Sequence, residues 1–193
     1  MRSVVAGAKL IRRPRRGLFL IRFIASILLI VAPAGAVGSD PGNLAARGLV
    51  GSGDDVLIGG LIVADAPVTV LLRARGPSIE SSAIPGSGPL ADPYLQLFDA
   101  SGVIDSNDNW SSHASASLVP ASLAPTSGLE AAMVVTLNPG AYTAIVSGVA
   151  GATGVGVVES FYLSGEGRLH NISTRALVGT GDAVLIGGFI LTG

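Results

Sequence analysis

The sequence predicts an all-β protein, an antiparallel β-sandwich preceded by an N-terminal signal-peptide helix. From Asn43 onward, short apolar runs alternate with clusters of Gly, Pro, Asn, Asp and Ser, and no run keeps the periodicity of an amphipathic helix. Hydrophobic residues make up 49% of the chain and charged residues 13%, so the chain can bury a core. A long internal repeat is the third observation, because such repeats are typical of modular arrays.

The repeat opens and closes this region. Residues 43–63 read NLAARGLVGSGDDVLIGGLIV and residues 171–191 read NISTRALVGTGDAVLIGGFIL, an offset of 128 residues (171 − 43) with 13 of 21 positions identical. Each copy has two apolar runs around a glycine-rich turn, which is Gly51–Asp55 in the first copy. Since glycine supplies the positive φ of a tight return, we expect a hairpin in each copy. The second hairpin either opens another module or closes the sheet of the first.

The pattern between the two copies predicts further strands. Residues 68–75 alternate, so one side of this strand should face the core, and Arg73 and Arg75 on the other side should be solvated or paired with carboxylates. Residues 111–128 are rich in Ser, Ala and Pro and predict a surface loop. The other predicted strands are 44–50, 56–63, 94–98, 103–104, 131–137, 141–149 and 155–163.

The charges are divided unevenly along the chain. Seven of the twelve basic residues lie before residue 37, and all thirteen acidic residues follow it, so the remainder carries a net charge of −8 (5 − 13). An acidic body without a basic patch argues against nucleic acid or an anionic membrane as partner. The sequence has no cysteine, which excludes disulfides, thiolate nucleophiles and zinc-thiolate sites.

Residues 1–36 have the three parts of an export signal. Arginines crowd the start, an apolar run interrupted by Arg22 follows over residues 17–31, and small residues at 34–36 suit a cleavage site. The alternative is an uncleaved anchor, but the uninterrupted apolar part is shorter than the roughly 20 residues that a spanning helix needs. We expect cleavage after Ala36 and a secreted or cell-surface protein, which would touch the membrane only if the signal stays attached.

Seven short motifs give the chain a family resemblance: VLLRARGP (70–77), LADP (90–93), LQLFD (95–99), NDNW (107–110), LNPGAYTA (137–144), GATG (151–154) and NISTR (171–175). Together with the repeat, they resemble a tandem module of large secreted bacterial proteins, a resemblance that covers about residues 43–193 and implies no defined activity. More distantly, their order is similar to the bacterial prepeptidase C-terminal domain, which implies a jelly-roll-like sandwich. Some relatives of that domain bind calcium.

The most polar stretch, residues 105–110, is the candidate cation site. Asp105, Asn107, Asp108 and Asn109 offer oxygen ligands at near-alternate spacing, which suits a hard cation such as Ca²⁺. The stretch lacks the spacing and the terminal glutamate of an EF-hand. Asn and Asp are also common in turns because their side chains bond the nearby backbone. An Asx-rich turn is therefore the simpler interpretation, and calcium is the one cofactor that the sequence suggests.

Two more residues are candidates for function. Trp110 is either a core residue or a stacking platform for a sugar ring, and burial is favoured because large aromatic side chains dominate burial energy. His113 lies among serines, so a Ser-His-Asp arrangement is conceivable, but the Gly-x-Ser-x-Gly elbow is absent. The simpler interpretation of His113 is an exposed loop residue. We expect no enzyme.

The sequence thus divides into a signal peptide (1–36), a β-sandwich repeat module (37–170) and a repeat hairpin (171–193). The expected function is non-catalytic, that of a secreted or cell-surface structural or adhesion-type repeat. Its expected partners are neighbouring repeat units, which exposed glycine-rich edges could join, or other extracellular domains. The alternative is a module that binds calcium or polysaccharide, and a contiguous exposed aromatic surface would favour the latter.

Overall fold

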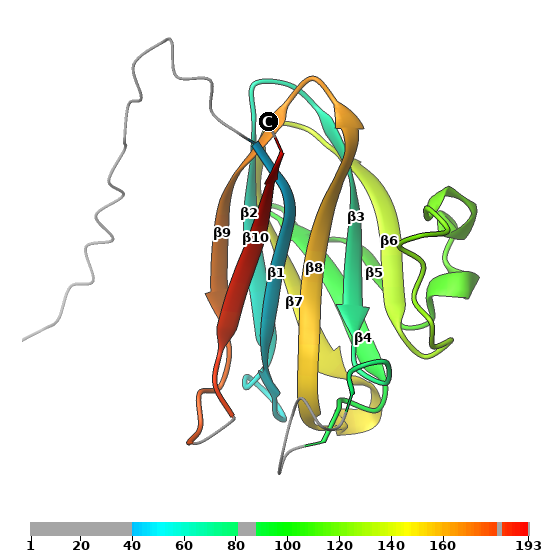
Figure 1. Cartoon of the computed structure of the whole chain (residues 1–193), viewed down its shortest axis with the longest axis vertical. Coiled ribbons are helices and arrows are strands. Elements are labelled where there is room, and N and C mark those ends of the chain that lie inside the picture. Colours follow the sequence, from blue (N-terminus) through cyan, green and yellow to red (C-terminus); the bar gives the residue numbers. More distant parts are fainter. Residues whose placement is uncertain (1–39, 81–87, 181–182, 193) are drawn as a thin grey trace, which may run out of the picture. The chain divides into compact units, whose positions relative to one another are not determined.

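Two antiparallel five-stranded sheets pack face to face in a computed structural model, which describes residues 40–80, 88–180 and 183–192 (Figure 1). Sheet A has the strand order β10-β1-β8-β3-β6, and sheet B has the order β5-β4-β7-β2-β9. The predicted β-sandwich is confirmed. The strands are β1 (Asp40–Val50), β2 (Leu57–Ala64), β3 (Val68–Arg75), β4 (Pro93–Asp99), β5 (Gly102–Asn107), β6 (Ala131–Leu137), β7 (Gly140–Gly148), β8 (Gly154–Gly165), β9 (Arg168–Arg175) and β10 (Ile186–Thr192).

The first eight strands pair as a long hairpin that has been rolled up. β1 pairs with β8, β2 with β7, β3 with β6 and β4 with β5, and the roll then joins β3 to β8 and β4 to β7. This is the jelly-roll arrangement, in which the successive strand pairs of a folded hairpin alternate between the two sheets. The last two strands add to it, since β9 pairs with β2 in sheet B and β10 pairs with β1 in sheet A.

The core lies between the sheets and follows the alternation of the strands. In β4 the inward residues Leu95 and Leu97 are fully buried, while Gln96 between them is half-exposed. In β3 the side predicted to face inward is buried, and Leu71 on the other side is buried as well. Further fully buried side chains come from β2, β6 and the loop before β4, and include Leu57, Met133 and Leu90.

The glycine-rich turn of each repeat copy is not a hairpin turn, so that prediction is wrong. β1 lies in sheet A and β2 in sheet B, and the turn between them crosses from one sheet to the other. The same hydrogen bond closes the turn in both copies. In the first copy the Gly51 N–H donates to the Asp55 carbonyl (2.6 Å), and in the second the Gly179 N–H donates to the Ala183 carbonyl (2.7 Å). The jelly roll explains the difference, because it pairs β1 with the distant β8 rather than with its neighbour in sequence.

The two repeat copies are related by an approximate two-fold axis. The first strand of each copy pairs with the second strand of the other, and the register is the same in both pairs. Leu44 lies opposite Phe189 and Arg47 opposite Ile186. After the offset of 128 residues, the same positions give Ile172 opposite Leu61 and Arg175 opposite Ile58.

Equivalent residues of the two copies meet near this axis. Leu49 and Leu177, which occupy the same repeat position, form an isolated antiparallel bridge. Gly48 and Ala176 are also equivalent, and a Cβ built on Gly48 would lie 2.6 Å from the Cβ of Ala176. There is room for one methyl group at this contact but not for two. The sequence difference between the copies at this position therefore matches the packing.

We predict that Gly48→Ala destabilises the protein by about 1–3 kcal/mol, because it overpacks the contact with Ala176. The reciprocal double variant Gly48→Ala/Ala176→Gly should recover most of this loss, since the methyl group only moves to the other copy. Chemical denaturation of the four proteins gives the coupling energy. Gly187→Ala is the matched control, because its Cβ would meet no atom within 4 Å. Additive effects of the two substitutions would contradict the shared axis.

Most predicted strands match the structure within two residues of each end, and β1 and β5 are the exceptions. β1 begins at Asp40, before the predicted start at residue 44, and β5 continues to Asn107 and takes up part of the polar stretch 105–110. The predicted surface loop 111–128 contains two short 3₁₀ helices, η2 (Trp110–Ser112) and η3 (Ala116–Leu118). The predicted export signal lies outside the described residues. In the part of the chain that the structure describes, no helix is long and apolar enough to cross a membrane.

Candidate functional site

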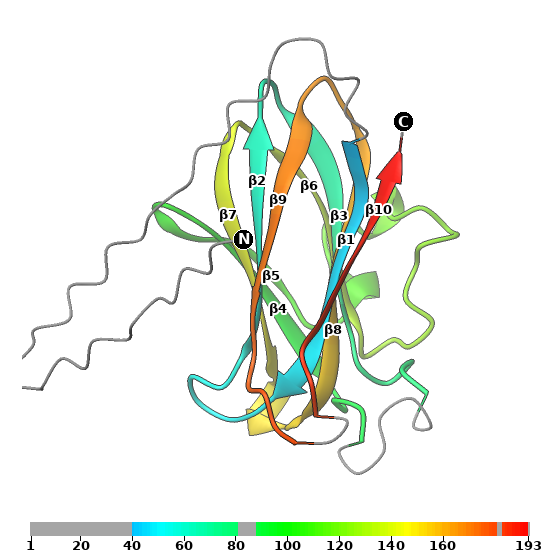
Figure 2. The ribbon, with the colours of Figure 1, turned by 60° about the vertical axis from the view of Figure 1, so that its left-hand side comes forward.

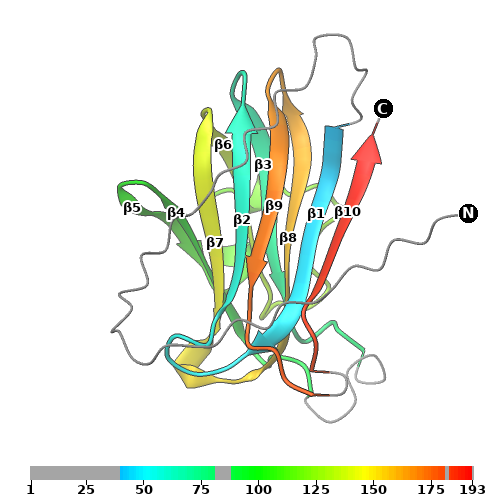
Figure 3. The same ribbon diagram turned by 90° about the vertical axis from the view of Figure 1, so that its left-hand side faces the viewer.

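The two lateral sides of the sandwich, called its ends below, have different outer strands. One end has β5 and β6 as its outer strands, and the other has β9 and β10 (Figure 3). An outer strand exposes unpaired backbone N–H and C=O groups, and folded proteins usually block such groups against further pairing. The loop that follows β5 lies beside β6 (Figure 1), whereas no described strand pairs with the outer side of β9 or β10.

Side chains cap the outer edge of β6. The Ala132 N–H donates to Oδ1 of Asn107 (2.9 Å), and the Val134 N–H donates to Oγ of Ser115 (2.8 Å). Asn107 and Ser115 are both buried. Asn107 also holds the start of the loop, because its Nδ2 donates to the Asn109 carbonyl (3.0 Å). These bonds take the place of a neighbouring strand and close this edge of sheet A.

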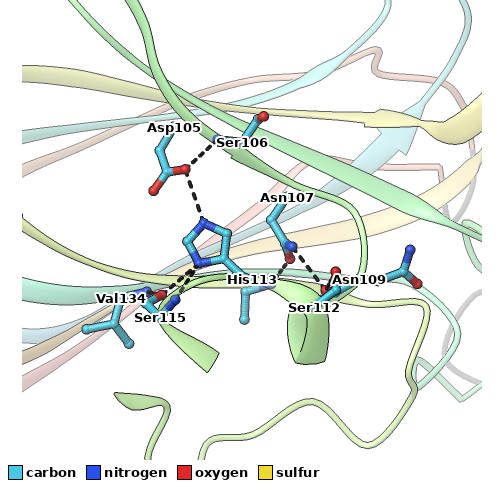
Figure 4. A network of polar contacts seen from close by, with 9 residues as sticks. Asp105, Ser106, Asn107, Asn109, Ser112, His113, Ser115 and Val134 are labelled. Carbon is cyan, nitrogen blue, oxygen red and sulfur yellow. Dashed lines mark hydrogen bonds and ion pairs between the residues drawn. The ribbon is translucent and has the colours of Figure 1, made fainter. Parts of the chain in front are cut away.

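His113 connects this cap to β5 (Figure 4). Its Nδ1 lies 2.8 Å from Oγ of Ser115 and also accepts the Ser115 N–H (3.2 Å), and its Nε2 lies 3.1 Å from Oδ1 of Asp105. A nitrogen that accepts a backbone N–H is unprotonated, so the network assigns the proton to Nε2, which donates to Asp105. The His113 side chain is only 12% exposed. The prediction of an exposed loop residue is therefore wrong.

Ser115, His113 and Asp105 form a serine–histidine–aspartate chain within hydrogen-bond distance. In this geometry the Ser115 hydroxyl can donate to His113 while its oxygen accepts the Val134 N–H. The hydroxyl is thus engaged on both sides and lies in a buried residue, where a substrate carbonyl would have to displace the β6 backbone. The chain of bonds links the outer strands of the two sheets through the loop. Its evident chemical effect is to fasten that loop.

A second anchor fixes the loop to the outer face of sheet A. Nε of Arg73 lies 2.6 Å from Oε2 of Glu159, and the guanidinium stacks 4.9 Å from the ring centre of Phe161. An N–H group of Arg73 donates to the carbonyl of Leu123 in the loop (2.5 Å). The prediction that the outward arginines of this strand are paired is confirmed for Arg73. Arg75 instead donates to Oγ of Ser78 (2.9 Å).

Glu130 is a buried carboxylate that the sequence did not reveal. Its Oε1 accepts the N–H groups of Gly76 and Ser78 (3.0 Å each) and the Ser78 hydroxyl (2.6 Å). Three donors offset part of the cost of burying this oxygen, and they fix the turn that ends β3. The glycine and proline of that turn were visible in the sequence. Its acidic partner, 54 positions away, carried no local signal.

The four residues predicted to bind a cation have different surroundings. Oδ1 of Asp105 contacts His113 and the Ser106 N–H, and Oδ1 of Asn107 accepts the Ala132 N–H. Asn109 contributes its main-chain carbonyl to the bonds that hold the loop. Asp108 lies near Asp92. Among the described residues, no group of three or more His, Asp or Glu side chains is placed to hold a metal.

Asp92, just before β4, has an unusual environment. Burial raises the pKa of its carboxyl group, and the Asp108 carboxylate raises this pKa further. Oδ1 of Asp92 is buried and has no hydrogen-bond partner among the described residues. Both effects disfavour the charged form, so either a proton or a cation would relieve this site.

Trp110 is half-buried at the start of η2. Its backbone N–H donates to the Glu130 carbonyl (2.9 Å), which places the indole where the loop meets the sandwich. It therefore lies between the two environments that the sequence suggested, the core and an exposed stacking platform.

The edge formed by β9 and β10 is apolar and open (Figure 2). Val178, Phe189 and Leu191 are 60%, 63% and 50% exposed, whereas the residues at the same positions of the first copy are 0%, 4% and 2% exposed. The residues of the first copy are Val50, Leu61 and Val63. The second copy thus has apolar residues at these positions, although the described part of the chain leaves them exposed.

No protein-family model, curated protein or solved structure matches this chain.

Asn107→Ala should destabilise the protein by about 1–3 kcal/mol, because it leaves the Ala132 N–H buried without an acceptor. The nearby Asn109→Ala is the matched control, since the Asn109 side chain makes no capping bond. Chemical denaturation measures both effects. Equal stabilities of the two variants would contradict the assigned role of Asn107.

Proposed function

We propose that this chain is a non-catalytic structural module, exported to the cell surface or beyond, that holds or spaces neighbouring parts of an extracellular assembly. The observation that carries the proposal is the repeat, of which two copies share one sandwich and leave an apolar edge open at one end. The repeat contributes strands to the core of the sandwich and also forms its open edge, as expected of a module that assembles with similar modules.

The polar groups of the chain support the same proposal. Ser115, His113 and Asp105, which have the composition of a reactive site, instead help to cap β6 and fasten the loop, and Asn107 completes the cap. Buried polar networks of this kind rigidify a fold when their members are satisfied. The structural role therefore accounts for the histidine without a substrate.

Export can be tested with the full chain carrying an epitope tag after Gly193, produced in a bacterial host. We expect the tag outside the cytoplasm, accessible to protease added to intact cells, on a protein shortened by about 36 residues because a signal peptide is removed at its small-residue site. Leu28→Arg/Leu29→Arg, which interrupts the apolar run, should keep the full-length protein inside. A full-length cytoplasmic protein from the unaltered chain would contradict the proposal.

Calcium binding is a second candidate function, favoured by the pair Asp92 and Asp108. Two nearby carboxylates and a buried oxygen without a partner are groups that a hard cation can satisfy. Backbone carbonyls and water would have to supply the remaining ligands, since Ca²⁺ takes six to eight oxygens.

Asp92→Asn separates the two candidates. Because folding raises the pKa of Asp92, the ionised carboxylate lowers the free energy of unfolding. This loss of stability appears as the pH rises above the ordinary pKa of aspartate, and it is absent at lower pH, where Asp92 is protonated in both the folded and the unfolded state. Without calcium, the variant should therefore have a higher melting temperature than the unaltered protein at pH 7, and the two melting temperatures should be equal at pH 3. If calcium binds here, 100 times its dissociation constant should add about 2.7 kcal/mol to the unaltered protein and none to the variant. A melting temperature indifferent to calcium and EDTA would rule this candidate out.

A further inference from the structure

We infer that the open edge formed by β9 and β10 docks a second module of the same kind, whose strands equivalent to β8 and β7 extend both sheets. The inference rests on the proposed function as an assembly module and names the partner of that edge. It follows from the approximate two-fold axis, which makes each strand of the second copy structurally equivalent to one of the first.

The first-copy strands have two neighbours each, and the second-copy strands have one. β1 lies between β10 and β8, and β2 lies between β9 and β7. In the described part of the chain, β9 pairs as a strand with β2 alone and β10 with β1 alone. The free side of β9 is therefore the side on which β1 carries β8, and the free side of β10 is the side on which β2 carries β7.

The glycines of the repeat indicate what is missing. A Cβ built on Gly59 in β2 would lie 3.0 Å from Cγ1 of Val158 in β8, so this position accommodates a close neighbour. At the equivalent Gly187 in β10, a Cβ would meet no atom within 4 Å. The second copy therefore has a glycine at this position, although no described side chain takes the place that Val158 has beside Gly59. A module carrying the equivalent of Val158 would fill this space.

A whole second copy of this chain cannot supply these strands as they stand. The edges of β8 and β7 that would be needed are already covered by β1 and β2 of the same copy. The occupant is instead a module body that begins after the first two strands and borrows β9 and β10 to complete itself. At the opposite end, the edge of β6 is not available for such docking, because Asn107 and Ser115 cap it.

The repeat also fixes the register of docking. In the first copy Gly60 lies opposite Thr143 of β7, so Gly188 should lie opposite the equivalent of Thr143 in the docked module. The neighbouring residue Ala144 faces the core and would point away from this pair. A shift by one residue would thus place the wrong face inward.

The test uses a longer chain in which residues 66–193 are repeated after Gly193, since Gly193 aligns with Asp65. We expect the second body to fold, and hydrogen exchange at the amides of residues 186–191 to slow by at least about 100-fold relative to the unextended chain, because an edge strand becomes a central one. An unfolded second body, or unchanged exchange in β10, would overturn the inference.

Two variants make the test specific. Gly187→Val should leave the unextended chain as stable as before but prevent the slow exchange in the longer chain, because it fills the space meant for valine. Because the sequence has no cysteine, Gly188→Cys with Thr143→Cys of the appended segment should form a disulfide, whereas Ala144→Cys of that segment should not. Equal cross-linking of both pairs, or tolerance of Gly187→Val in the longer chain, would overturn the inference.

Light scattering of the unextended chain tests the alternative that a second copy of this chain occupies the edge of β9 and β10. A stable dimer with protected β10 amides would identify a second copy as the partner and overturn the inference. The docking tests and the export test can fail separately. Modules can pair in solution whether or not the chain is exported, and an exported chain can fail to pair.

Discussion

The unpaired backbone of a sheet edge is the constraint on which this structure depends. A jelly roll of eight strands has two open ends, and each end exposes one outer strand from each sheet. Here the two ends are treated in opposite ways. At β6, side-chain oxygens of Asn107 and Ser115 accept the outward N–H groups, while at the other end the second repeat copy continues both sheets and leaves their edges open.

The capped end explains much of the polar sequence. The loop after β5 must stay beside β6 for the cap to work, and it is held by His113 on one side and by Arg73 on the other. Asp105, Glu159 and the Phe161 ring position these two residues in turn. A loop that looks like low-complexity sequence is therefore tied to the sandwich at several points, which gives its polar side chains a structural role.

Local pattern predicted most of the strands because alternation and turn residues are local signals. It failed where the structure depends on distant pairing. The turn Gly51–Asp55 has the composition of a hairpin turn, yet it crosses between sheets because β8, about a hundred residues away in sequence, is the partner of β1. Glu130 was missed for the same reason, because its partners Gly76 and Ser78 lie 54 and 52 positions away in sequence. The partners of His113, Ser115 and Asp105, are close in sequence, but the local pattern did not show that the loop folds back against β5 and β6 and buries the imidazole.

The repeat is the one long-range signal that the sequence did contain, and its consequence is geometric. The two copies pair with each other around an approximate two-fold axis, so the outer edges of β9 and β10 are equivalent to the edges of β1 and β2 that pair with β8 and β7. The first copy shows what such an edge can hold, with Leu61 and Val63 buried and Gly59 pressed against Val158. The second copy has apolar residues at the first two positions, Phe189 and Leu191, and glycine at the third, although these positions are exposed among the described residues. Exposed apolar side chains lower solubility and invite aggregation, so a chain that maintains them at repeat positions needs a reason to do so. Completion by a neighbouring module of the same design provides that reason, and it needs no contact that the first copy does not already make.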